Sequence, residues 1–202
     1  PGHHDENGIV FRTFDPVARI LSCFACHSTG PLSLGHNDDV KPHELGVRCE
    51  VCHGPGSAHA ADPAHNPLRT PRHFTAAAMN QFCAQCHRVD DESGEQIADL
   101  ADFRNARDQP LRLAASACFR NSAGRLNCFT CHTPHQELNA DLSSYNARCQ
   151  SCHATKVHRA SVTGQACVTC HMPRVPNGDL LSFANHRIGV YAAGNPLVPT
   201  GR

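Results

Sequence analysis

Six short segments of the sequence place two cysteines and a histidine in the same arrangement, Cys-x-x-Cys-His. They are residues 23–27, 49–53, 83–87, 128–132, 149–153 and 167–171. With 13 cysteines and 16 histidines in 202 residues, chance alone would supply roughly 0.07 copies. In this arrangement the two thiols can form thioethers to a porphyrin, and the neighbouring imidazole can bind its iron. The sequence therefore predicts six sites of covalent haem c attachment.

The predicted site residues form two sets. The thioether cysteines are Cys23, Cys26, Cys49, Cys52, Cys83, Cys86, Cys128, Cys131, Cys149, Cys152, Cys167 and Cys170. The proximal iron ligands are His27, His53, His87, His132, His153 and His171. In a zinc site the adjacent histidine would point away from the two thiolates, and iron–sulfur ligation would leave all six histidines without a role. A thioredoxin-like pair would need a βαβ context that the sequence lacks.

The composition offers little material for an ordinary hydrophobic core. Aromatic residues make up 5% of the chain, tryptophan is absent, and glycine and proline number 14 each. Six haems would supply broad apolar rings that the polypeptide can wrap. The expected fold class is therefore a mostly irregular multihaem cytochrome c with short α-helices, few or no strands and six stacked haems as its core.

Punctuating residues predict where the regular elements lie. Thr75 is expected to cap a helix from Ala76 to His87 that delivers the third motif. A second helix is expected from Leu111 to Phe119. Residues 28–46 show little periodicity and are interpreted as a loop, and the Gly/Pro-punctuated end, residues 189–202, as extended.

The domain organisation follows from the spacing of the motifs. Residues 88–110 form a long polar connection, which favours a boundary between an N-terminal part, 1–100, and a C-terminal part, 101–202, with three motifs each. The last three motifs are too closely spaced for separate domains. We therefore expect the two parts to form one continuous haem-packed unit. The motifs show no fixed period, which argues against a solenoid of equal repeats.

The sixth ligand of each iron decides between an electron carrier and a catalyst. Ten histidines remain outside the motifs, whereas methionine occurs only at positions 79 and 172, so bis-histidine ligation is expected at all six irons. The distal candidates, best first, are His135, His59, His186, His158, His43, His36, His73, His3 and His4, with His65 last.

Chain reach limits which iron each candidate can bind. Two imidazoles on opposite faces of one iron hold their Cα atoms roughly 12 Å apart, whereas three residues span at most about 10 Å. His135 follows His132 by three residues, so it cannot complete the haem of His132 and is expected to bind a neighbouring iron. The same reasoning applies more weakly to His59 and His158. Mutual donation of this kind would clamp adjacent haems together.

Cys118 is left over once the motifs have used the other twelve cysteines. It could pair between chains, but a small buried residue in an apolar helix is the favoured interpretation. The polypeptide is formally neutral. Because each haem adds two propionates and the ferric porphyrin returns one positive charge, the assembled molecule is expected to be acidic. No nucleic-acid partner is indicated.

Processing and location are also suggested by the sequence. No apolar run is long enough to span a membrane, no signal peptide is visible, and the chain begins at Pro1, as expected of a processed product. Covalent haem attachment takes place outside the cytoplasmic membrane. The prediction is an exported protein, resident in a periplasm or outside the cell.

Four segments resemble the multihaem c-type cytochromes related to the tetrahaem electron acceptors of hydroxylamine oxidation. They are residues 49–59, 128–135, 167–173 and 183–188. In that family the histidine after the Gly-Pro-Gly turn and the histidine of the Pro-His pair bind other haems from the distal side. The resemblance implies this role for His59 and His135, and haems stacked in alternating parallel and T-shaped pairs. The chain departs from the family in its six motifs and its short, histidine-bearing N-terminus.

The number of motifs also resembles hexahaem cytochromes that polymerise into extracellular conducting filaments. There a histidine of one subunit completes a haem of the next, and the resemblance implies His3 or His4 as such a donor. The expected function is electron transfer along bis-histidine haems, in a filament or in a soluble periplasmic shuttle, with other redox proteins as partners and no enzymatic activity. The alternative is a multihaem oxidoreductase acting on a small nitrogen or sulfur compound, which would need a five-coordinate haem.

Overall fold

A computed structural model describes residues 17–36, 39–90, 94–154, 158, 164–178 and 181–200. Contacts within the chain divide it into two compact units, the second of which begins at Thr75. We call residues 11–74 the two-motif unit and residues 75–202 the four-motif unit, after the number of Cys-x-x-Cys-His segments that each carries.

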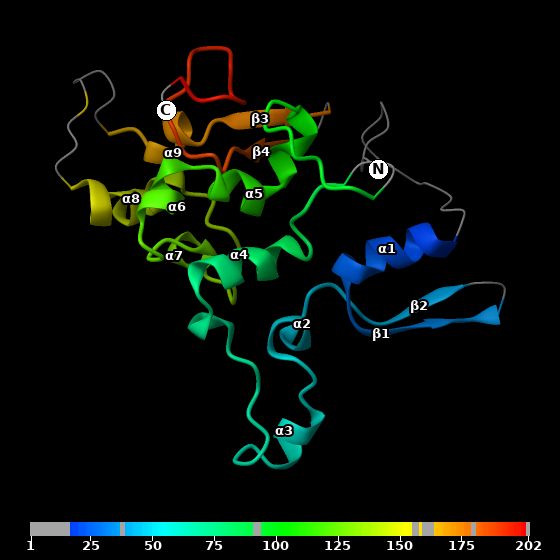
Figure 1. The fold of residues 1–202 in the computed structure, drawn as a ribbon. Helices are drawn as coiled ribbons and strands as arrows, with labels where there is room; N and C mark the ends of the chain where they lie inside the picture. Colours follow the sequence, from blue (N-terminus) through cyan, green and yellow to red (C-terminus); the bar gives the residue numbers. More distant parts are fainter. Residues whose placement is uncertain are drawn as a thin grey trace. The chain divides into compact units, whose positions relative to one another are not determined.

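The two-motif unit is built from three short helices and a hairpin. Its elements are α1 (Val17–His27), β1 (Ser28–Leu34), β2 (Val40–Leu45), α2 (Cys49–His53), α3 (Ser57–Ala61) and the 3-10 helix η2 (Pro71–His73). Strands β1 and β2 lie side by side and pair antiparallel (Figure 1). The pairing places Ser28 opposite Leu45 and Leu34 opposite Val40. The first motif closes α1, and the second motif forms α2.

The prediction of a loop over residues 28–46 is wrong, because most of it is this hairpin. Most residues of both strands are exposed or half-exposed, so the alternation of apolar and polar residues that reveals a half-buried strand is missing. Backbone pairing holds the hairpin instead. Its base is fixed by Thr29, whose hydroxyl donates to the Gly46 carbonyl at 2.7 Å and accepts from the Arg48 amide at 2.9 Å.

The four-motif unit contains most of the helices and a second hairpin. Its elements are α4 (Ala76–Ala84), η3 (Phe103–Arg107), α5 (Gln109–Ala114), α6 (Ala117–Asn121), α7 (Cys128–Cys131), η4 (Leu142–Tyr145), α8 (Asn146–His153), α9 (Cys167–His171), β3 (Arg174–Asn177) and β4 (Leu181–Ala184). Strands β3 and β4 pair antiparallel, with Arg174 opposite Ala184 (Figure 1). The described residues after Ala184 form no helix or strand.

Side-chain caps set the helix boundaries in this unit. The predicted cap at Thr75 is confirmed, since its hydroxyl accepts from the Ala78 amide at 3.2 Å, although α4 ends at Ala84 rather than at His87. The single helix predicted over residues 111–119 is wrong. Ser116 interrupts it, because its hydroxyl caps α6 by accepting from the Phe119 amide and also donates to the Leu113 carbonyl.

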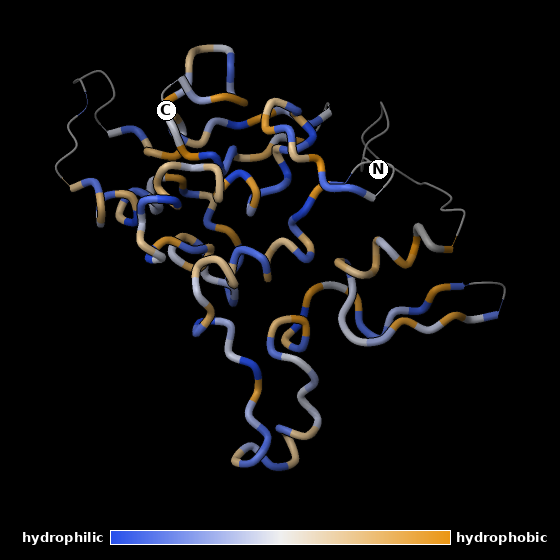
Figure 2. Tube along the Cα trace, viewed as in Figure 1, coloured by the Kyte–Doolittle hydropathy of each residue, from blue (hydrophilic) through white to orange (hydrophobic). Residues whose placement is uncertain are grey.

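The two units differ in what they bury. The buried hydrophobic residues of the described chain all belong to the four-motif unit and are Ala76, Met79, Val89, Ile97, Ala106, Leu113 and Val175. In the described part of the two-motif unit the buried residues are Ser28, Thr29 and Pro71. Short hydrophobic stretches alternate with hydrophilic ones along the trace of each unit (Figure 2). The prediction of short helices, much irregular chain and few strands is confirmed, and the stacked haems remain a prediction.

A fully buried arginine lies at the centre of the four-motif unit. The Arg112 side chain is 0% exposed. Its guanidinium donates to the backbone carbonyls of Leu100, Asp102, Asn105 and Leu197 and to the side-chain oxygen of Asn185. Burial lowers the pKa of Arg112, yet an arginine stays protonated at neutral pH. One buried cation therefore ties together segments that are far apart in the sequence.

The polar stretch before α5 is packed into the four-motif unit rather than forming a linker. The Ile97 amide donates to the Val89 carbonyl, and the buried Asp108 accepts from Gln96 at 2.8 Å. Contacts divide the chain after Phe74, ahead of the boundary near residue 100 that the sequence favoured. The assignment of three haems to residues 1–100 and three to 101–202 stays a prediction. In the described part of the chain, no helix has the length and apolar character needed to cross a membrane.

Candidate haem-binding sites

Helix covers all or part of each Cys-x-x-Cys-His segment. The first, second, fifth and sixth motifs end their helices with the histidine, whereas α7 ends at the second cysteine of the fourth motif and α4 ends at Ala84, between the two cysteines of the third. Cysteines three residues apart on a helix lie on the same face, so the pairs that are helical throughout can bond to one porphyrin edge. None of the thirteen cysteines, all of which lie in the described residues, forms a disulfide. No three of the described histidine, cysteine, aspartate and glutamate side chains gather into a site for a free metal ion.

Consecutive motifs of the four-motif unit lie close together. Helix α4, which carries Cys83, contacts α7, which carries Cys128, and α8 contacts α9. The Cys83 and Cys128 thiols share a hydrogen bond, which lowers the pKa of Cys83 and raises that of Cys128. Burial, with the thiols of Cys167 and Cys131 nearby, raises the pKa of Cys149 to about 11.

Several proximal histidines are oriented through the nitrogen that would not bind iron. His53 Nδ1 donates to the Arg69 carbonyl at 2.9 Å, and His171 Nδ1 donates to the Gly189 carbonyl at 2.8 Å. His87 Nδ1 lies 3.2 Å from Oε1 of Gln109. A carbonyl only accepts, so these histidines carry the proton on Nδ1 and the lone pair on Nε2, the atom that would bind a metal. These histidines therefore have the tautomer that haem ligation requires.

In the two-motif unit a single arginine holds the second motif. Arg69 Nε donates to the Cys52 carbonyl and Nη2 to the Val51 carbonyl, both at 2.9 Å. The Arg69 amide also donates to the His53 carbonyl at 3.1 Å. These bonds satisfy carbonyls at the C-terminal end of α2 that the short helix leaves unpaired. The same residue thus fixes both the backbone of the motif and, through its own carbonyl, the ring of His53.

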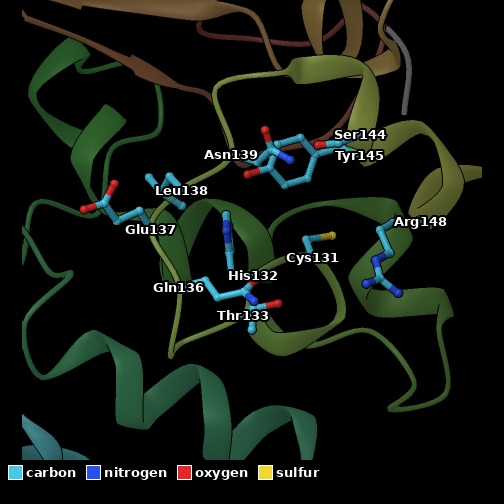
Figure 3. Close-up of a pocket in the computed structure, with 10 residues that line it drawn as sticks. All are labelled: Cys131, His132, Thr133, Gln136, Glu137, Leu138, Asn139, Ser144, Tyr145 and Arg148. Carbon is cyan, nitrogen blue, oxygen red and sulfur yellow. The ribbon is translucent and has the colours of Figure 1, made fainter.

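The fourth motif opens onto a cavity of about 220 Å³. Figure 3 shows the His132 imidazole within it, with Asn139 and Tyr145 beside the ring and Cys131 and Arg148 nearby. The ring of Tyr145 lies edge-on to that of His132, with centroids 6.1 Å apart. Burial lowers the pKa of His132, and its Nδ1 is buried without a partner in the described residues. A neutral imidazole beside a free thiol thus faces an open space.

His186 is the distal candidate that lies beside this proximal histidine. The ring centroids of His132 and His186 are 6.1 Å apart, with planes inclined at 35°. His186 Nδ1 donates to the Ala184 carbonyl at 3.0 Å, which leaves its Nε2 free. Burial lowers the pKa of His186 to about 4, and the nearby His132 and His87 lower it in the same direction. The ring is therefore neutral at pH 7, as a metal ligand must be.

A second distal candidate lies beside a different proximal histidine. The ring centroids of His158 and His171 are 5.8 Å apart, with planes inclined at 70°. His158 is exposed. It follows His153 by five residues, and chain reach predicted that it would bind the iron of a neighbouring motif. The structure brings it to the proximal histidine of the next motif in the sequence.

The other distal candidates lie in varied settings. His59 is within α3, and its Nδ1 donates to the Asn66 carbonyl at 2.9 Å. His135, His36 and His43 are exposed, the last on β2 beside Gly30. His73 Nε2, the atom that would bind iron, accepts a hydrogen bond from Arg72 Nε at 3.4 Å.

The lowest-ranked and N-terminal candidates complete the set. His65 Nδ1 contacts the Asp62 carboxylate at 2.8 Å on the surface. His3 and His4 lie outside the described residues. All these distal roles, and the thioether and proximal assignments, stay predictions.

The residues present fit haem c. The cavity beside Cys131 and a second one of about 700 Å³ beside Cys170 each expose an attachment thiol. The second is lined mainly by apolar atoms and includes Pro173, Tyr191 and Pro196. The first cavity joins the Cys131 thiol and the His132 imidazole within a mainly polar lining, and the second joins the Cys170 thiol to apolar walls. Thiols, imidazole nitrogens and apolar surface are the groups that a covalently bound porphyrin needs.

Comparisons with known proteins support the same class, a multihaem c-type cytochrome with haem c and iron. Residues 11–54 match the family described as cytochrome c554 and c-prime. The matched segment contains both motifs of the two-motif unit.

The chain is also similar to a multiheme cytochrome, MtrA, of Shewanella baltica (strain OS185), at 27% identity over 175 residues. The alignment covers 67% of this chain and 53% of MtrA, so the chain spans about half the length of that relative. No solved structure gives a significant match.

Three functional residues were missed by sequence reasoning. Arg69 and Arg112 read as ordinary arginines, and Asn185 reads as a loop residue. Their roles depend on carbonyl groups that the fold brings from distant positions, so no local pattern marks them. The nearest signal is the position of Asn185 directly before the candidate ligand His186.

Proposed function

We propose that the protein transfers electrons through six covalently attached haems, each held between two histidines. The comparisons support a multihaem c-type cytochrome. The number of haems, the bis-histidine ligation and residence outside the cytoplasm belong to this proposal. Other redox proteins would be its partners, and no catalytic residue is assigned.

The observation that carries the proposal is the contact between motif-bearing helices of the four-motif unit. Helix α4 contacts α7, and α8 contacts α9. Between these pairs, η4 contacts both α8 and α9 and brings Tyr145 against His132 of the fourth motif. The Cys167 amide also donates to Asn146, the first residue of α8, at 2.8 Å. Neighbouring attachment points favour short electron-transfer steps from the third motif to the sixth.

The protein's part is to hold ligands and exclude competing chemistry. Haem iron, when bound, supplies the one-electron change. Carbonyl oxygens fix Nδ1 of His53 and His171, which keeps each Nε2 oriented toward the metal and raises its basicity. A second histidine on each iron would leave no open position for a substrate, which separates a carrier from an oxidoreductase.

Protein-film voltammetry of the haem-loaded protein tests the proposal. We expect a broad, reversible wave whose charge corresponds to six electrons per chain, and no catalytic current with nitrite, hydroxylamine or sulfite. Haem content from the pyridine haemochrome gives the matching count. A catalytic current accompanied by a high-spin ferric haem would show instead that the protein is an oxidoreductase.

The form in which the protein works is a separate part of the proposal. A filament would need a histidine donated between subunits, and the predicted donors, His3 and His4, lie outside the described residues. A soluble shuttle would need none. Electron microscopy of the purified haem-loaded protein distinguishes them, because filaments of stacked subunits are visible directly, and a His3→Ala/His4→Ala variant should then remain monomeric.

A further inference from the structure

We propose that His186 is the distal ligand of the haem attached at Cys128 and Cys131, and that the buried Arg112–Asn185 pair positions it there. This inference rests on the proposed bis-histidine ligation and adds which histidine serves which iron and what holds it.

The separation of the two rings matches that of axial ligands on one iron. With metal–nitrogen bonds of about 2 Å, two coaxial imidazoles place their ring centroids roughly 6 Å apart. His132 and His186 are separated by 6.1 Å. Rotation about the common axis is unrestricted, so the inclination of 35° between the planes is compatible with shared ligation.

In His186, the ring nitrogen that would bind iron, Nε2, is not the one that hydrogen-bonds to the protein backbone. Nδ1 of His186 donates to the Ala184 carbonyl, at the end of β4. Nε2 lies on the far side of the ring from Nδ1 and carries the lone pair. The β3–β4 hairpin therefore sets both the tautomer and the direction of this ring.

Asn185 fixes the backbone on both sides of His186. Its side chain is 0% exposed. The backbone amide of Asn185 donates to the Pro173 carbonyl at 2.9 Å. In the Asn185 side chain, Oδ1 accepts from the Arg187 backbone amide at 2.9 Å, and Nδ2 donates to the Pro196 carbonyl at 2.6 Å. His186 thus lies between Asn185 and Arg187, and hydrogen bonds of Asn185 hold the backbone of both residues.

Arg112 completes this support. Its Nη1 donates to Oδ1 of Asn185 at 3.1 Å, while its other bonds reach backbone carbonyls of residues 100–105 and 197. These hydrogen bonds offset the cost of desolvating a buried guanidinium. The geometry indicates a positioning role, since only a guanidinium can hold the Asn185 oxygen and these carbonyls at once.

His87 is the competing proximal histidine, because it is near enough to influence the pKa of His186. Two variants separate the two irons. We expect His186→Ala to convert one haem equivalent per chain from low-spin to high-spin, with unchanged haem content. In a Cys128→Ala/Cys131→Ala background, which lacks the fourth haem, the same change should add no high-spin signal. A high-spin signal that persists in that background would assign His186 to another iron and overturn the pairing.

His186→Met gives a further check if the double-cysteine background does not mature. Methionine can also bind iron, so one haem should remain low-spin and acquire the far-red absorption band of histidine–methionine ligation. The control is Lys41→Ala, which removes an exposed side chain paired with Asp39 and should leave every haem low-spin. An unchanged spectrum for His186→Ala would overturn the assignment.

The positioning role has its own control. Asn185→Ala should make part of one haem high-spin, whereas Asn185→Asp retains an acceptor for Arg112 and Arg187 and should restore the low-spin spectrum. Asn177→Ala also removes a buried amide, which donates to the Phe103 carbonyl at 3.4 Å, and should leave the spin state unchanged. If Asn185→Ala gives no high-spin signal, the pair is structural only. Absence of bound haem in the parent protein would instead count against the proposed function.

Discussion

Both units of the molecule contain an arginine that donates to several backbone carbonyls, but the two arginines lie in different surroundings. Arg112 of the four-motif unit is fully buried, beside a set of buried apolar side chains. Arg69 of the two-motif unit is exposed, and that unit buries no large apolar residue in its described part. Buried side-chain contacts therefore support the four-motif unit, whereas the described part of the two-motif unit is held mainly by backbone pairing and exposed hydrogen bonds.

The largest expected effect is at Arg112. Replacement by methionine removes the five hydrogen bonds that the guanidinium donates to four backbone carbonyls and to the Asn185 oxygen, so we expect a loss of about 3–5 kcal/mol in local stability. Hydrogen exchange measured by mass spectrometry on the haem-loaded protein should show it in residues 100–105 and 185–197. Arg120→Met, which removes an exposed arginine bonded to the Ala115 carbonyl, is the control and should change exchange little. Equal exchange in the two variants would contradict the central role of Arg112.

A smaller effect is expected at Arg69. Its side chain donates to the Cys52 and Val51 carbonyls, but water can replace these bonds because the residue is exposed. Arg69→Ala should therefore cost about 1 kcal/mol, visible as faster exchange confined to residues 49–53. A loss as large as that of Arg112→Met would remove the distinction between the two arginines.

The capping box of the fourth motif should contribute a similar amount. Asn127 Oδ1 accepts from the Phe129 amide at 2.9 Å, and Thr130 Oγ1 accepts from the Asn127 amide at 3.0 Å. Asn127→Ala should destabilise α7 by about 1 kcal/mol, whereas Asn127→Asp should retain the cap. The measurement is the rate of amide hydrogen exchange of residues 128–132 in the two variants. Identical rates in wild type and Asn127→Ala would show that haem attachment alone fixes this turn.

The smallest effect concerns acidity. A hydrogen bond from Arg104 lowers the pKa of Asp102, although burial partly opposes it. Because the folded-state pKa lies below the unfolded value of about 3.9, the stabilisation is fully present at neutral pH and is lost as the pH falls through the lowered pKa. Asp102→Asn should abolish this acid-dependent part of the stability of η3. Hydrogen exchange of residues 102–107, measured as a function of pH, provides the test. An unaltered acid dependence in the variant would assign it to another carboxylate.

The candidate attachment segments could be recognised in the sequence because the relevant spacing is local, and their role stays a prediction. The two cysteines and histidine of residues 128–132, for instance, lie within one turn of chain, and the Thr75 cap is equally local. The hairpin of residues 28–45 was missed, since strands exposed on both faces leave no hydrophobic alternation.

Pairing of ligands was beyond sequence reasoning. His186 could be recognised as a candidate, but its position beside His132 depends on the β3–β4 hairpin and on Arg112. Such contacts join residues far apart in the chain, and each depends on the whole unit being folded.

The short segment from Asn185 to Gly189 serves two motifs at once. His186 lies beside His132, and the Gly189 carbonyl accepts from Nδ1 of His171 at 2.8 Å while the Gly189 amide donates to the carbonyl of the same histidine. A displacement of these few residues would alter axial bonding at one centre and imidazole basicity at another. Their midpoint potentials would then shift together, so the two redox centres would be tuned as a linked pair.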